Sequence, residues 1–233
     1  MKTPVLLILA AVLLAVTLAG AGAPQFAIPE TQPLAQTGQN SGGPNSPAFQ
    51  TLIEPGLSVG PLKLGDTRDR ALQLFPRKDE DQEWEDKCGT TLYWVDTDNR
   101  NGRGDLTIHL KKDKVFQIES STTRFHTAEG ITTFDPPEKV KGTYKDLLAY
   151  ALLTAPAPAL GDRPLVFWLD KKNGIAFALA YYPAQHKRYV YKIIVFVPNK
   201  TFCPEGEKTD SPLWQQIPPY SLEVPNDLAM NRQ

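Results

Sequence analysis

Two stretches of the sequence carry the same succession of signals, and that succession limits the possible folds. In each stretch, helix-start signals are followed by three short runs rich in β-branched and aromatic residues, with polar turns between them. The first stretch covers residues 55–124 and the second covers residues 125–206. An internal duplication explains this order. We therefore predict an α+β fold of two tandem repeats, each with helices followed by a three-stranded antiparallel meander, and with the helices packed on one sheet face.

The strand signals are six short runs of the sequence. They are TTLYWVD, DLTIHL and VFQIES in the first half, and LVFWLD, IAFALAYY and RYVYKIIVFV in the second half. Asn173 and Gly174 form a strong hairpin-turn signal between two of these runs. Each half is therefore expected to supply three neighbouring antiparallel strands.

The helix signals come from capping residues and prolines. Asp66 is a good N-cap for a helix that Pro76 ends. The prolines at 136–137 can begin a short helix, and Thr143 is expected to cap a stronger helix with Leu147 on its apolar side. We interpret the acidic run at residues 79–86 as a solvated loop or helix face.

The beginning of the chain differs from this central part. Lys2 precedes an uncharged apolar run and then the small residues 19–21, which is the layout of a secretory signal peptide over residues 1–21. An uncleaved membrane anchor is the alternative, although the apolar run is short for a spanning helix. Residues 22–54 are rich in proline, glutamine and glycine, so we predict a disordered linker.

The end of the chain is again rich in proline. We assign residues 55–206 to the globular domain and residues 207–233 to a C-terminal tail. The apolar side chains of Trp214, Ile217, Tyr220 and Leu222 would allow part of this tail to pack on the domain as extended chain.

Charge and cysteine content restrict the possible partners and the compartment. The formal net charge is −1, which disfavours a general nucleic-acid or membrane-surface binder. The two cysteines, Cys88 and Cys203, are expected to form a disulfide because exported chains fold in an oxidising compartment. Two free thiols are the alternative. The protein is expected in the periplasm or the medium, without a membrane span after signal cleavage.

Two segments carry a family resemblance. VGPLKLGDTRDRALQLF and TAEGI, each followed by helix and hairpin signals, resemble the tandem helix–meander units of the β-lactamase-inhibitor-protein type. The small lipoprotein of the outer-membrane β-barrel assembly machine uses the same fold. The resemblance covers about residues 55–200. It implies helices on one face of an antiparallel sheet and non-enzymatic protein binding. The lipoprotein's anchoring cysteine is absent and no inhibitory residue is matched, so neither membrane tethering nor β-lactamase inhibition is implied.

The search for catalytic and metal sites gives no assignment. His126 and Glu129 lie close together in RFHTAEGITT, but no base, nucleophile and orienting residue accompany them, so we interpret this stretch as a junction between repeats. The loop from Asp96 to Asp105 contains several oxygen ligands but lacks the glycine and final glutamate of a calcium loop. The three histidines have no zinc spacing. We therefore assign no residue to a catalytic, metal or cofactor site, while calcium binding by the loop from Asp96 to Asp105 stays an alternative.

The candidate partner-binding surface is the hairpin tip YYPAQHKRYVYK at residues 181–192. Tyrosine and arginine are enriched at interface hot spots. The alternative is that the tyrosines cover the edge of the core while the cations keep the tip soluble. The candidate residues are Tyr181, Tyr182, His186, Arg188, Tyr189 and Tyr191.

Two functional hypotheses follow. The first is an exported, non-catalytic binding or scaffold protein whose partner is a protein or a polymer of the cell envelope. The second is a small cell-envelope hydrolase with a site assembled from distant residues, for which His109 and His126 are the first residues to test.

Overall fold

The computed structural model describes residues 50–78, 81–96, 104–153, 163–203 and 213–224. All of them belong to one compact unit, Pro47–Gln233. The expected signal peptide, and the expected linker up to residue 49, lie outside the described residues. So do residues 97–103, which form most of the calcium-like loop.

The described residues are mostly β-strand, so the expected α+β class of helix-plus-meander repeats is wrong. They form two sheets and contain only two α-helices, α1 (Arg68–Leu74) and α2 (Pro137–Thr143), each of seven residues. One short 3-10 turn, η2 (Pro183–Gln185), lies at a hairpin tip. The internal duplication stays a prediction.

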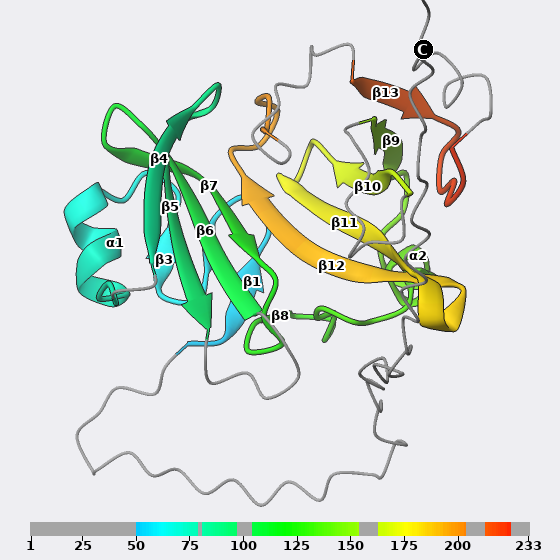
Figure 1. Cartoon of the computed structure of the whole chain (residues 1–233), viewed down its shortest axis with the longest axis horizontal. Helices are drawn as coiled ribbons and strands as arrows, with labels where there is room; N and C mark the ends of the chain where they lie inside the picture. The colour runs from blue at the N-terminus through cyan, green and yellow to red at the C-terminus, as the bar shows by residue number, and fades with distance from the viewer. Residues whose placement is uncertain (1–49, 79–80, 97–103, 154–162, 204–212, 225–233) are drawn as a thin grey trace, which may run out of the picture. The chain divides into compact units, whose positions relative to one another are not determined.

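The larger sheet has nine strands in the order β13-β9-β10-β11-β12-β7-β6-β5-β4, and all of its neighbouring strands are antiparallel (Figure 1). Two four-stranded meanders, β4 to β7 and β9 to β12, meet where β7 pairs with β12. The bounds are β4 (Gln82–Asp86), β5 (Gly89–Asp96), β6 (Gly104–Lys111), β7 (Lys114–Ser120), β9 (Leu148–Leu152), β10 (Leu165–Asp170), β11 (Ile175–Tyr182), β12 (Lys187–Phe196) and β13 (Trp214–Ile217).

The smaller sheet has four short strands in the order β3-β2-β1-β8. Their bounds are β1 (Leu52–Glu54), β2 (Ser58–Val59), β3 (Leu62–Lys63) and β8 (His126–Thr127). Strand β8 runs parallel to β1. The segment expected to join two repeats therefore pairs with the beginning of the described chain.

The first expected helix is confirmed, with a different cap. Helix α1 begins after Thr67, whose hydroxyl accepts a hydrogen bond from the Arg70 amide at 3.1 Å. The Asp66 carboxylate instead accepts from the Lys63 amide. The sequence therefore located the helix but assigned its cap one residue early.

The expected helix after Thr143 is wrong, because this segment forms β9. Thr143 ends α2, and its hydroxyl donates to the Lys139 carbonyl. Asp146 has a φ of 59°, a left-handed conformation that interrupts a helix. The following residues pair with β10 on one side and β13 on the other. The acidic run is likewise neither loop nor helix over residues 82–86, which form the edge strand β4.

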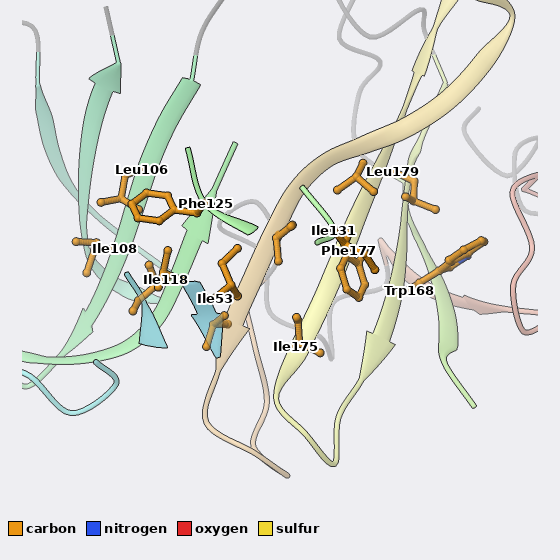
Figure 2. Close-up of a cluster of buried hydrophobic side chains, with 14 of the residues drawn as sticks. Ile53, Leu106, Ile108, Ile118, Phe125, Ile131, Trp168, Ile175, Phe177 and Leu179 are labelled. Atoms are coloured by element: carbon orange, nitrogen blue, oxygen red, sulfur yellow. The ribbon is translucent and has the colours of Figure 1, made fainter. Parts of the chain in front are cut away.

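The main core lies between the large sheet and the small sheet. Ile53 of β1 packs among residues of both meanders, such as Ile118 of β7 and Phe177 of β11 (Figure 2). A second cluster fills the opposite face of the second meander, with Phe167, Phe196 and Trp214 among its members. Both faces of this meander are therefore buried, which explains the near-continuous apolar strands at residues 165–182.

The expected packing of the C-terminal segment as extended chain is confirmed for the described part. Trp214 and Ile217 lie in β13, and the Tyr220 ring meets the Trp168 ring edge-on at 5.4 Å. The Trp168 indole donates to the Ser221 carbonyl at 3.1 Å. No described helix is long and apolar enough to cross a membrane.

Candidate functional site

A cluster of buried charged groups lies on one face of the large sheet. Ile108 and Ile118 belong to the main core, so alternation along β6 and β7 places His109 and Glu119 on the opposite face. His109 Nε2 lies 2.9 Å from Glu119 Oε1, and Lys192 Nζ lies 3.0 Å from Glu119 Oε2. The Lys192–Glu119 pair therefore links the two meanders.

The electrostatics of Glu119 follow from its neighbours. Burial by itself raises the pKa of the Glu119 carboxyl, but the Lys192 ammonium and the hydrogen bond with His109 outweigh this effect. The pKa of Glu119 is therefore held well below its usual range. Glu119 is an ionised acceptor at neutral pH and has no role as a proton donor there.

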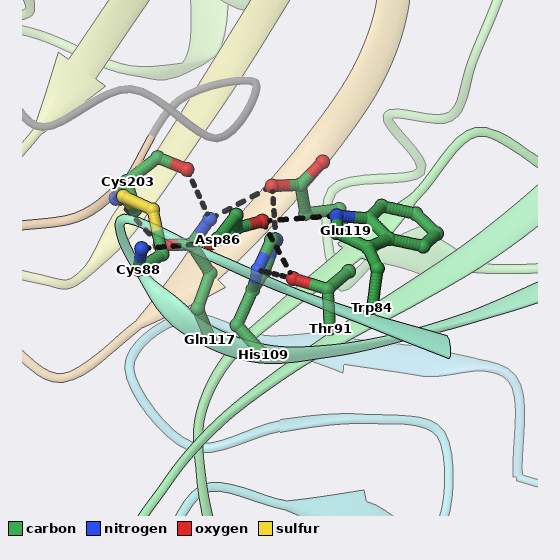
Figure 3. The surroundings of a disulfide bond; sticks show 8 residues. All are labelled: Trp84, Asp86, Cys88, Thr91, His109, Gln117, Glu119 and Cys203. Atoms are coloured by element: carbon green, nitrogen blue, oxygen red, sulfur yellow. Dashed lines mark hydrogen bonds and ion pairs between the residues drawn. A yellow bond between two sulfur atoms is a disulfide. The ribbon is translucent and has the colours of Figure 1, made fainter. Parts of the chain in front are cut away.

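The Gln117 side chain joins this cluster to the disulfide (Figure 3). Its amide nitrogen donates to Glu119 Oε1 and to the Cys203 carbonyl, both at 2.8 Å. Its amide oxygen accepts from the Cys203 backbone at 2.8 Å. Cys203 is bonded to Cys88, with 6.0 Å between their Cα atoms, so the predicted disulfide is confirmed. A disulfide is compatible with an oxidising, exported compartment.

Thr91, His109 and Glu119 form a hydroxyl–imidazole–carboxylate series. Thr91 Oγ1 lies 3.0 Å from His109 Nδ1 and 2.9 Å from a carboxylate oxygen of Asp86. The Thr91 hydroxyl donates its single proton to the Asp86 carboxylate. The Thr91 side chain is 0 % exposed, so a substrate carbonyl has no access to this oxygen. We define Thr91, His109, Gln117, Glu119 and Lys192 as the Glu119 network, which is a stabilising unit in this structure.

The His126 and Glu129 side chains hold a loop together. His126 Nε2 lies 3.3 Å from the Thr51 hydroxyl, and its Nδ1 lies 3.0 Å from the Thr127 carbonyl. Glu129 accepts from the Tyr144 hydroxyl at 3.1 Å. Burial raises the pKa of Tyr144, and the Glu129 charge raises it further. His126 and His109 lie in different sheets, so the structure does not bring these two candidate residues into one site.

The candidate residues of the hairpin tip have different surroundings. Arg188 is 6 % exposed, and its guanidinium donates to three backbone carbonyls, those of Pro164, Leu179 and Leu222. Burial lowers the pKa of Arg188 to about 10. Arg188 therefore fastens the C-terminal segment to the sheet and presents little surface to a partner.

The tyrosines of the tip fall into two groups. The Tyr181 hydroxyl lies 3.2 Å from His186 Nδ1, and the Arg163 guanidinium stacks 4.1 Å from the Tyr181 ring centroid. Tyr182 and Tyr189 meet edge-on at 5.6 Å. Burial, and the neighbouring Tyr191, raise the pKa of Tyr182 to about 12. These contacts place the rings but leave their role at an interface a prediction.

Phe134 is a surface residue that the sequence analysis missed. Its ring centroid lies 6.1 Å from that of Tyr182, its side chain is 42 % exposed, and its φ is 67°. The preceding Thr133 is 2 % exposed, and its hydroxyl has no hydrogen-bond partner in the described residues. No sequence signal marks a phenylalanine with a left-handed backbone, because this conformation depends on the tertiary structure.

Comparison with known proteins gives no further assignment. No protein-family model, no curated protein and no solved structure matches this chain. The site is therefore interpreted from its geometry and chemistry.

Proposed function

We propose that this chain is an exported, non-catalytic binding protein whose partner is a protein or a polymer of the cell envelope. The contact surface consists of Phe134, Tyr182, Tyr189 and Tyr191, and we name it the aromatic surface. Export rests on the signal-peptide pattern at residues 1–21, and the disulfide is compatible with it.

The observation that carries this proposal is the conformation of Phe134. A left-handed backbone costs a residue with a Cβ about 1–2 kcal/mol, and glycine or asparagine avoids most of that cost. Tyr220 also has a positive φ, 56°, but it packs against Trp168, and its hydroxyl donates to the Tyr144 carbonyl. Phe134 instead has 42 % of its side chain exposed. Its conformational cost therefore has little packing to offset it, which is a feature of functional sites.

The backbone around Phe134 is held firmly. The Phe134 amide donates to the Val190 carbonyl at 2.8 Å, and the Val190 amide donates to the Asp135 carbonyl at 2.9 Å. The Asp135 carboxylate accepts from the Thr132 amide and from Lys139 Nζ, both at 2.8 Å. The exposed ring is therefore presented by a fixed loop, which lowers the entropic cost of binding.

The neighbouring tyrosines enlarge the aromatic surface around the exposed Phe134 ring. Tyr182 contacts both Phe134 and Tyr189, and all three tyrosines of the aromatic surface are half-buried. Aromatic side chains with few rotatable bonds supply large contact areas at low entropic cost. This arrangement suits a partner with apolar or planar groups, such as a protein segment or a sugar ring.

Cross-linking in the native cell envelope tests the proposal. Tagged protein is expressed with its own leader and cross-linked, and the captured material is identified by mass spectrometry. We expect one recurrent partner, and we expect its recovery to fall at least tenfold for Phe134→Asn combined with Tyr189→Ala.

The matched control is Trp84→Ala. Trp84 is 41 % exposed and lies on β4, the edge strand at the other end of the sheet. We expect this variant to capture the partner as the unchanged protein does. Equal recovery with all three proteins would exclude the aromatic surface, and loss with Trp84→Ala alone would place the interface on β4.

A further inference from the structure

A cavity of about 160 Å³ lies on the far side of the second meander from the main core. Its floor contains Tyr150 of β9, Trp214 of β13 and Phe202, and its rim contains Lys171, Lys200 and Thr201. None of these residues belongs to the aromatic surface or to the Glu119 network. The cavity is therefore a separate feature of the molecule.

The floor consists of packed aromatic side chains, of which Trp214 and Phe202 are buried and Tyr150 is half-buried. The Tyr150 and Trp214 rings stack at 4.8 Å with 9° between their planes, and Phe202 meets Trp214 edge-on at 5.4 Å. Phe202 also stacks on Phe196 at 5.1 Å. These contacts fix the side chains before a ligand arrives. A planar apolar group is the kind of ligand that packs against the half-buried Tyr150 ring.

The rim carries two positive charges, those of Lys171 and Lys200. Lys171 and Lys200 are exposed, and neither ammonium has a hydrogen bond or ion pair with any described residue. The described residues that line the cavity include no acid. The adjacent Asp170 carboxylate accepts from the backbone and side chain of Asn173.

The backbone holds the two lysines at the same rim. The Asn199 amide donates to the Lys171 carbonyl at 2.8 Å, and the Lys200 amide donates to the Val197 carbonyl at 3.1 Å. The disulfide at Cys203 fixes the end of this segment, immediately after Phe202. Lys171, Lys200 and Thr201 therefore line the same cavity, although Lys171 lies about 30 residues before the other two in the sequence.

We propose that this cavity binds a small aromatic carboxylate, with the ring against the half-buried Tyr150 and the carboxylate between Lys171 and Lys200. Lysine ammonium groups pair with carboxylates as point charges, and the Thr201 hydroxyl supplies a further donor at the rim. The floor alone selects a flat apolar group, and the rim alone selects an anion. Together they select ligands that have both features.

Benzoate is the probe that tests this site. Its binding to the disulfide-bonded protein is followed by tryptophan fluorescence and by the NMR shift of the Trp214 indole proton. Benzyl alcohol tests the ring without the charge, and acetate and inorganic phosphate test the charge without the ring. We expect saturable benzoate binding with an affinity at least tenfold above that of each of the other three compounds.

Two lysine variants and one control complete the test. Lys171→Gln and Lys200→Gln are each expected to weaken benzoate binding about tenfold. Lys172→Gln removes another exposed charge from the same turn as Lys171, outside the cavity lining, and is expected to leave binding unchanged. Absence of saturable benzoate binding would overturn the proposal. Equal binding of acetate or phosphate, or an equal loss with Lys172→Gln, would also overturn it, because binding would then depend on general charge.

Discussion

The Glu119 network and the loop at residues 132–135 differ in whether contacts compensate their buried polar groups and backbone strain. In the network, buried charges have partners at 3.0 Å or less. In the loop, a buried Thr133 hydroxyl has no partner in the described residues, and Phe134 has a left-handed backbone and an exposed ring. Natural proteins retain such costs where they serve a function. The comparison therefore separates a region that stabilises the fold from a region that we propose binds a partner.

Of the changes proposed in and around the Glu119 network, removal of the Cys88–Cys203 disulfide is expected to lower the free energy of unfolding most. It joins residues 115 positions apart, so the chain-entropy model gives a stabilisation of about 4–5 kcal/mol. Cys88→Ser combined with Cys203→Ser should lower the free energy of unfolding by this amount in urea titrations. A thiol assay on denatured, unreduced protein is the control. Two titratable thiols would contradict the disulfide itself.

Removing one charge of the network is expected to cost slightly less. Glu119→Leu removes the carboxylate that pairs with the buried Lys192 ammonium, and breaking a buried pair costs about 3–5 kcal/mol. Adding Lys192→Met should recover only the part of this loss that comes from the Glu119–Lys192 pair, because the His109 imidazole and the Gln117 amide still lack their Glu119 acceptor. Urea unfolding of the two single variants and the double variant measures the coupling. Additive losses would show that the pair is not a unit.

Acid should reduce the contribution of the Glu119 network to the free energy of unfolding. The folded-state pKa of Glu119 lies below its unfolded value, so its contribution is present above the unfolded pKa, about 4.3. The contribution declines as the pH falls from about 5 towards the folded pKa. We expect the unchanged protein to lose on the order of 2 kcal/mol more than Glu119→Gln between pH 7 and pH 3. Parallel stability curves for the two proteins would contradict this assignment.

The sequence predicted the features that depend on neighbouring residues. The strand runs at residues 105–110 and 115–120 lie in β6 and β7, and the Asn173–Gly174 turn joins β10 and β11. The disulfide followed from the cysteine count and the expected compartment. The β9 segment was misread because LAYAL suits a helix as well as a strand until strands β10 and β13 pair with it.

The contacts within the network and the loop depend on residues far apart in the sequence. Gln117 and Glu119 alternate with apolar residues, which is also the pattern of a solvent-facing strand surface. Their burial depends on Lys192 and Cys203, which are 73 to 86 residues away. The φ of Phe134 likewise depends on its pairing with Val190. The sequence analysis therefore named the hairpin tyrosines and His109, but it identified neither the rest of the buried network nor the phenylalanine beside the tyrosines.

The smallest expected effect on stability is at Phe134 and distinguishes it from Tyr220. Asparagine tolerates a left-handed backbone, so Phe134→Asn should relieve strain and lose little packing, with a net change within about 1 kcal/mol of zero. Tyr220→Asn should instead cost about 2–4 kcal/mol, because it removes the ring packed on Trp168 and the hydroxyl that donates to Tyr144. Thermal and urea unfolding measure both variants. A loss above 2 kcal/mol for Phe134→Asn would show that the ring serves the fold. A near-neutral change in stability together with loss of partner capture would show that Phe134 is retained for binding. The ring would then make no contribution to stability that offsets its conformational cost.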